Sequence, residues 1–249
     1  MGKLTEILQK AGRSYGGSIG FSGKSANAPK PKAAAIIVSA TDIDGVAALV
    51  KAGADAVLLS ADADMTATKT PEVAWGVDAR SAKTLAVADL KSLHERGADF
   101  VLVGTHTPMR ALTSEVEHLD RVLFIAPPEN DPLLMAFRSL NVVDVEVGVL
   151  DLQFKAKELA NLTVEKFAQT RLLTEYLRFP VIVTLHEMPA DDDVATLARL
   201  GIHGIWLTNA TPEAVTQLRE ALERVPREKD PQAPQGIAGL TGGNSPLGR

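Results

Sequence analysis

The chain has 249 residues, of which 45% are hydrophobic, 23% charged and 4% aromatic, and its formal net charge is −5. This composition is typical of a soluble α/β protein with a full core, and the lack of cysteine excludes disulfides, thiolate catalysis and cysteine-ligated metals. Without a basic block or a long apolar run, the sequence predicts no nucleic-acid partner, no membrane association and a cytoplasmic location.

Residues 1–32 are predicted to form a helix and a Gly/Pro-rich loop ahead of the main domain. The stretch GGSIGFSGKS at 16–25 ends like a phosphate-binding loop, but Ser18 stands where that motif needs its first glycine. A helical pattern precedes the stretch, and Pro29 and Pro31 follow it, so it lacks the strand and helix that such a loop connects. We interpret it as a connection, and we expect the helix to close the bottom of the domain.

Eight short apolar runs follow, separated by segments with helical periodicity, and most of them are rich in Val, Ile and Leu without polar alternation. Strands that are covered on both faces have this pattern. The predicted strands begin near Ala34, Ala56, Val73, Phe100, Arg121, Val142, Val181 and Gly204. Among the helices, the last is predicted to have Thr211 as its N-cap and Pro212 as its first residue.

Three segments repeat one pattern, in which a helix ends at a glycine and turns directly into a strand: LVKAGADAVLLS, LHERGADFVLVG and LARLGIHGIWLT. Gly53, Gly97 and Gly201 suit the left-handed position after a helix. Eight strands that alternate with helices predict a (β/α)8 TIM barrel over residues 33–225, and an open doubly wound sheet is the alternative. Residues 226–249 are rich in Pro, Gly and polar residues and are predicted to be a flexible tail.

The GAD-x-VLL turns resemble those of (β/α)8 barrels of the phosphate-binding type, a group of sugar-phosphate isomerases, indole-glycerol phosphate synthases and flavin-binding barrels. The resemblance covers residues 33–225 and implies a phosphate site built by Gly-rich turns after strands seven and eight. In this chain the corresponding segments are LHEMPADDD and TNATPEAV, and the acidic residues of the first would repel phosphate.

Active sites of such barrels lie where the strands end, so polar residues there are the candidates. On several strands one face carries small or polar residues, and we assign that face to the barrel interior. This assignment places six charged or titratable residues in the barrel or its mouth: Asp62, Asp78, Arg80, His106, Glu146 and His186.

Glu146 lies inside an apolar run, where an unpaired carboxylate is costly, so it must be paired, protonated or metal-bound. We predict that Glu146, His106 and His186 are the catalytic acid–base groups. The alternative for Glu146 is a structural ion pair with Arg80 or another cation. The two histidines with Asp78 or Glu146 could also form a two-His-one-carboxylate metal site.

Asp62 and Asp78 are predicted to bind a divalent ion such as Mg²⁺, and the favoured alternative for Asp62 is a turn in which it caps the next helix. Arg80, Ser60 and Asn209 are predicted to bind substrate, with Arg80 holding an anionic group or else neutralising Asp78.

Together these residues predict an enzyme that acts on a small anionic carboxylate or phosphate metabolite by lyase- or isomerase-type proton transfer, with a divalent ion as the one cofactor suggested. The alternative is a non-catalytic ligand-binding or scaffold barrel whose tail docks a partner. The sequence leaves a homo-oligomer open.

Overall fold

The computed structural model describes residues 2–12, 32–43, 45–61, 72–82, 84–114, 116–126, 139–152 and 159–225. The predicted loop through 16–25 and the predicted tail at 226–249 lie outside the described residues, as do Asp62 and Asp64.

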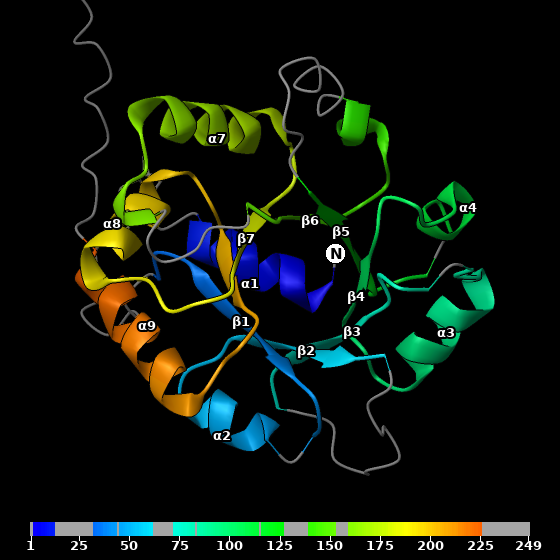
Figure 1. Ribbon diagram of the computed structural model, residues 1–249. Helices are drawn as coiled ribbons and strands as arrows, with labels where there is room; N and C mark the ends of the chain where they lie inside the picture. The colour runs from blue at the N-terminus through cyan, green and yellow to red at the C-terminus, as the bar shows by residue number, and fades with distance from the viewer. Residues whose placement is uncertain are drawn as a thin grey trace, which may run out of the picture.

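Eight parallel strands close into a barrel in chain order, and the eighth pairs with the first (Figure 1). The strands are β1 (Ala35–Ala40), β2 (Ala56–Ser60), β3 (Ala74–Asp78), β4 (Phe100–Val103), β5 (Asp120–Ile125), β6 (Val147–Leu150), β7 (Val181–Leu185) and β8 (Gly204–Leu207). The predicted (β/α)8 TIM barrel is therefore confirmed, and closure of the sheet excludes the open alternative. The strand starts agree with prediction to within one residue except in β6, where a 3-10 turn (η2, Leu140–Val142) precedes a strand that begins only at Val147.

Helices surround the barrel, and one more crosses one of its ends (Figure 1). They are α1 (Lys3–Gly12), α2 (Val46–Lys51), α3 (Val87–Glu95), α4 (Met109–Leu112), α7 (Val164–Tyr176), α8 (Asp191–Arg199) and α9 (Pro212–Arg224). As predicted, Thr211 caps α9 and Pro212 opens it, while Gly53, Gly97 and Gly201 have positive φ angles of 112°, 90° and 76°. Among the described residues, no helix is long and apolar enough to cross a membrane.

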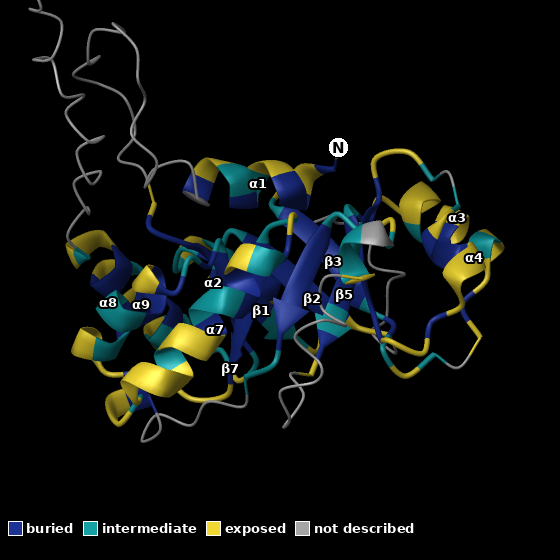
Figure 2. Cartoon of the chain, turned by 90° about the horizontal axis from the view of Figure 1, so that it is seen from above, coloured by how far each residue is buried: buried dark blue, intermediate teal, exposed yellow. Residues whose placement is uncertain are grey.

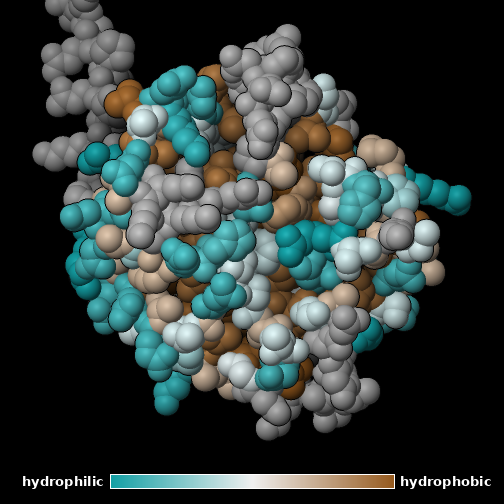
Figure 3. Space-filling model, viewed as in Figure 1, coloured by the Kyte–Doolittle hydropathy of each residue, from teal (hydrophilic) through white to brown (hydrophobic). Residues whose placement is uncertain are grey.

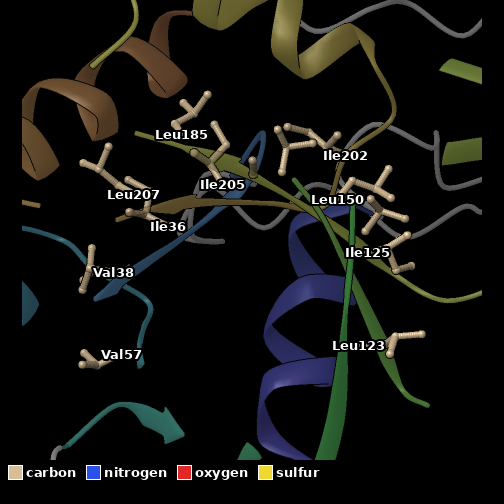
Figure 4. Close-up of a cluster of buried hydrophobic side chains, with 14 of the residues drawn as sticks. Ile36, Val38, Val57, Leu123, Ile125, Leu150, Leu185, Ile202, Ile205 and Leu207 are labelled. Atoms are coloured by element: carbon tan, nitrogen blue, oxygen red, sulfur yellow. The ribbon is translucent and has the colours of Figure 1, made fainter. Parts of the chain in front are cut away.

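Two apolar layers hold the barrel together. The outward-facing strand residues, such as Ile36, Val38 and Leu185, pack against the surrounding helices (Figure 4). The inward-facing residues of the opposite parity, such as Ile37 and Phe100, fill the lumen. Each large side chain removed from water stabilises the folded state by roughly 1.5–3 kcal/mol. Because side chains fill the lumen, a ligand can bind only at the ends of the barrel.

The helix α1 closes the end of the barrel at which the strands begin, as we predicted (Figure 2). Leu4 and Leu8 are fully buried against the lumen residues. The Asp120 carboxylate, 1% exposed, accepts hydrogen bonds from the backbone N–H groups of Gly2 and Thr5, both at 2.8 Å. Burial raises the pKa of Asp120, and the two N–H groups act in the opposite direction.

Four residues that immediately precede even-numbered strands make the same two-way contact with the preceding strand. Each donates its backbone N–H to the carbonyl oxygen of one residue on the preceding strand. Its side chain in turn accepts a hydrogen bond from the backbone N–H of that partner residue. The pairs are Asp55 with Ile36, Asp99 with Trp75, Glu146 with Arg121 and His203 with Val181. We call these four residues the strand-start clamps. They join the strands in pairs and repeat once in each quarter of the barrel.

Candidate active site at the C-terminal end of the barrel

The end of the barrel opposite α1 carries most of the predicted site residues. Figure 1 looks down onto this end, with α1 behind, and Figure 3 shows hydrophilic residues gathered over the middle of the same face. Ser60 ends β2, Asp78 ends β3 and Arg80 follows it, while His106, His186 and Asn209 follow β4, β7 and β8. The sequence therefore located these residues at the correct end.

Arg80 is held at this mouth by an ion pair and by two aromatic rings. Its Nε lies 2.9 Å and its Nη2 2.7 Å from the two carboxylate oxygens of Asp78. Its guanidinium carbon lies 4.4 Å from the centre of the Phe124 ring and 5.0 Å from that of Trp206. The two rings meet edge to face, so the guanidinium plane is fixed by cation–π contacts on β5 and β8 and by an ion pair on β3. The Arg80 side chain remains 34% exposed.

His186 lies between side chains of the two neighbouring strands. Its Nδ1 is 3.1 Å from the Thr208 hydroxyl oxygen, and its Nε2 is 3.5 Å from a carboxylate oxygen of Asp151. Asp151 directly follows β6 and is only 13% exposed, whereas the His186 side chain is 45% exposed. The imidazole is therefore oriented on both sides and still accessible to a ligand.

A cavity of about 660 Å³ opens between the ends of β1, β2 and β8 and the start of α9. Its lining includes Ser39, Ser60, Asp78, Thr208 and Asn209. Two of its lining residues contact the groups described above, because Asp78 pairs with Arg80 and Thr208 contacts His186. Ser39 accepts a hydrogen bond of 2.9 Å from Nε1 of Trp206. Arg80 and His186 therefore lie beside the cavity, each in contact with a residue of its lining.

His106 is exposed in the turn after β4. Its ring folds back over Gly104, where an added Cβ would lie 2.8 Å from Cε1 of His106, so this position tolerates only glycine without rearrangement. No described contact connects His106 with His186. Asn209 lines the cavity and donates a hydrogen bond of 3.2 Å to the backbone oxygen of His186.

The structure corrects the predicted position of Glu146. It precedes β6 and so lies at the N-terminal end of the barrel, on the opposite side from the histidines. Val147 and Val149 face the lumen, whereas Gly148 faces outward, where Phe179 fills the space that a side chain would need. The carboxylate of Glu146 pairs with the guanidinium of Arg121. Of the alternatives for Glu146, the structure therefore has the ion pair, with Arg121 as the cation.

The described residues hold no group of three His, Asp or Glu side chains that could bind a metal ion. The predicted set of His106 and His186 with Asp78 or Glu146 is therefore not assembled. Asp62, the other predicted metal ligand, lies outside the described residues, and Asp78 is engaged by Arg80.

The sequence placed Asp151 among the polar residues at the strand ends but indicated no role for it, and it did not single out Phe124 or Trp206, which also lie at this mouth. Asp151 has the same parity as Val147 and Val149, so the correct face of β6 would have identified it. Trp206 shares its face of β8 with Gly204 and Thr208, and this alternation indicates that its side chain lies on the barrel interior. Nothing in the sequence connects Phe124 with Arg80, because their contact depends on how the barrel closes.

Comparisons with known proteins agree with this architecture. No family model matches the sequence, and no curated protein sequence matches it significantly. Among solved structures, the chain is similar to tryptophan synthase from M. tuberculosis (TM-score 0.58, 11% identity, covering 89% of this chain and 98% of that chain). It is also similar to 3-hexulose-6-phosphate synthase from Salmonella typhimurium (TM-score 0.56, 14% identity, 77% and 97%).

Thiamine phosphate pyrophosphorylase from Pyrococcus furiosus is a third similar structure (TM-score 0.54, 14% identity, 77% of this chain and 96% of that chain). At these identities the likeness establishes the fold and leaves the chemistry to the site itself. The chain therefore shares the (β/α)8 barrel fold with these solved structures.

Proposed function

We propose that this protein is an enzyme that acts on a small anionic metabolite at the C-terminal end of its barrel, by lyase- or isomerase-type proton transfer. His186 is the acid–base group, Arg80 orients the anionic part of the substrate, and Ser60 and Asn209 contact the remainder in the cavity.

The observation that carries this proposal is the placement of His186 between Asp151 and Thr208. In its protonated form the ring has an acceptor at each nitrogen, because the Asp151 carboxylate faces Nε2 and the Thr208 oxygen faces Nδ1. These partners fix the ring orientation. The substrate displaces the Thr208 hydroxyl from Nδ1, so that Nδ1 exchanges the proton with the substrate while the Asp151 carboxylate still holds Nε2. The exposed fraction of 45% gives a substrate access to the ring.

The surroundings of His186 also support an enzyme. Active sites in this fold lie at the C-terminal end, and here a cavity, a fixed cation and an oriented imidazole meet at that end. The similar solved structures are named as enzymes, which favours the same general class. His106, in the turn after β4, is the candidate for a second proton-transferring group.

The test is proton exchange in D2O. Small carboxylates and sugar phosphates are incubated with the full chain, and ¹H NMR follows loss of C–H signals or appearance of product. We expect at least one compound to react with the wild type, and His186→Gln to lower that rate by about 10²–10⁴-fold. His94→Gln, an exposed position on α3, is the matched control and should leave the rate unchanged. Equal rates in H186Q and wild type, or no reaction by folded protein with any compound, would contradict the proposal.

A further inference from the structure

We propose that the substrate is an unphosphorylated hydroxylated carboxylate, whose carboxylate lies beside Arg80 and whose hydroxyl groups occupy the mouth cavity. This inference rests on the proposed function and specifies its substrate class. Four features of the mouth carry it: the helix that starts at the cavity, the segment after β7, the lining of the cavity, and the environment of Arg80.

The N-terminus of α9 lines the cavity but is already capped by its own chain. Barrels of this fold often bind phosphate with the loops after strands seven and eight and a helix N-terminus there. Such a terminus needs free backbone N–H groups. In this protein Pro212 has no N–H, and the Thr211 hydroxyl accepts the N–H of Ala214 at 3.2 Å. Glu213 adds a negative charge in the first turn, which opposes an anion.

The segment after β7 also disfavours phosphate. The connection from His186 to Ala190 contains no glycine, and α8 begins with Asp191, Asp192 and Asp193. Carboxylates in a first turn satisfy the positive end of the helix dipole. Asp191 is itself paired with Arg224 of α9. Both helices of this sector therefore supply their own negative groups.

The lining of the cavity suits hydroxyl groups. Hydroxyls and a carboxamide come from Ser39, Thr41, Ser60, Thr208 and Asn209, carboxylates come from Asp42 and Asp78, and none of the described lining residues is Lys, Arg or His. Ser39 accepts from Nε1 of Trp206, so its own hydroxyl hydrogen can be donated to another group. A phosphate would find no positive charge in this lining, whereas a chain of hydroxyl groups can both donate and accept.

Arg80 provides donors for one carboxylate. Asp78 engages Nε and Nη2, which leaves Nη1 as the nitrogen that Asp78 does not use. The Phe124 and Trp206 rings hold the guanidinium plane in place, so little ordering is needed when a ligand binds. Because Asp78 already balances its charge, Arg80 offers hydrogen bonds without the surplus charge that a dianionic phosphate requires.

The experiment is isothermal titration of the full chain with four-, five- and six-carbon aldonates, together with sorbitol, 6-phosphogluconate and inorganic phosphate. We expect at least one aldonate to bind, 6-phosphogluconate to bind no more tightly than gluconate, and inorganic phosphate not to compete. Arg80→Gln should weaken the aldonate by about 10–100-fold and leave sorbitol unchanged, since one charge-assisted hydrogen bond is lost. Arg178→Gln, an exposed site, is the matched control.

Failure of this inference differs from failure of the proposed function. If 6-phosphogluconate binds more than about tenfold more tightly than gluconate, if inorganic phosphate displaces the ligand, or if no aldonate binds, the substrate class is wrong. The proposed function still holds in that case if H186Q abolishes exchange of another compound. If an aldonate binds to both wild type and H186Q but neither exchanges a proton, the substrate class stands and the catalytic role of His186 falls.

Discussion

The two ends of the barrel use similar side chains for different purposes. At the end where the strands begin, Asp55, Asp99, Glu146 and His203 each close a two-way contact with the preceding strand. At the other end, Arg80 and His186 are held by neighbours but remain partly exposed, next to residues that line a cavity. Carboxylates and imidazoles therefore mark stability at one end and candidate chemistry at the other, and their place along the strand distinguishes the two roles.

The closing helix shows the same division on a larger scale. The lumen is plugged by α1 at the N-terminal end, with Leu4, Leu8 and the buried Asp120 cap. At the C-terminal end Arg80 lies across the mouth between two aromatic rings, one-third exposed. Substitutions at the two ends should therefore have different effects. At the closed end they should lower stability, and at the accessible end they should lower binding or turnover.

The largest effect is expected at the plug. Leu8→Ala removes a side chain that is fully buried at the closed end, and such truncations cost about 2–5 kcal/mol. Thermal unfolding should show a midpoint lower by roughly 5–15 °C, with ligand affinity unchanged below the transition. Lys10→Ala, on the exposed face of α1, is the control and should change the midpoint little. An unchanged midpoint in L8A would mean that α1 does not hold the barrel closed.

The next effect is expected at the Glu146 clamp. Glu146→Gln removes the charge that faces Arg121, whose side chain is 14% exposed. We expect a loss of about 1–2 kcal/mol, reduced by partial exposure of the carboxylate, as measured by urea unfolding. Asp144→Asn, an exposed neighbour, is the matched control. A stability equal to wild type would show that the pair contributes no net energy.

A smaller and pH-dependent effect is expected at His203. Burial lowers the pKa of this imidazole, whose Nδ1 accepts the N–H of Val181. The unfolded chain binds a proton near pH 6.5 while the folded protein still resists it, so stability falls as pH drops below about 6.5. His203→Asp places there the residue found at Asp55 and Asp99. In thermal unfolding from pH 7.5 to 5, this variant should lose less stability than wild type. An equal or steeper loss would contradict the role of His203 as a neutral acceptor for the N–H of Val181.

The smallest effect on stability is expected at His186. Because the side chain is 45% exposed, His186→Gln should change the unfolding free energy by no more than about 0.5 kcal/mol while it lowers the rate by about 10²–10⁴-fold. Chemical denaturation of H186Q beside H94Q measures this. A large loss of stability in H186Q alone would indicate that the Asp151–His186–Thr208 contact holds the fold rather than a substrate.

The sequence was sufficient for the architecture because its signals are local. Apolar runs gave strand number and order, and Gly53, Gly97 and Gly201 marked the turns into strands, since only glycine readily adopts their positive φ angles. The strand ends also identified His186, Arg80 and Asp78 at the correct mouth. The helix caps at Thr163 and Thr211 follow the same local logic.

The misplacement of Glu146 has a physical reason. We assigned small and polar residues to the lumen, but Gly148 faces outward, where the Phe179 ring occupies the space beside it. Glu146 has the same parity as Gly148 and so shares that outward face. The clamp was visible as a pattern, since Asp55, Asp99 and His203 occupy the same place in the three repeated turns. Contacts between distant strands, such as Arg80 with Phe124, depend on barrel closure and have no local signal.

The most direct measurement compares Glu146→Gln with His186→Gln in the D2O exchange experiment, at a temperature where both variants are folded. We predict that E146Q reacts at the wild-type rate although it is less stable, and that H186Q is as stable as wild type but reacts about 10²–10⁴-fold more slowly. A folded E146Q without activity, beside an H186Q that reacts normally, would place the chemistry at the N-terminal end and contradict the division between the two ends.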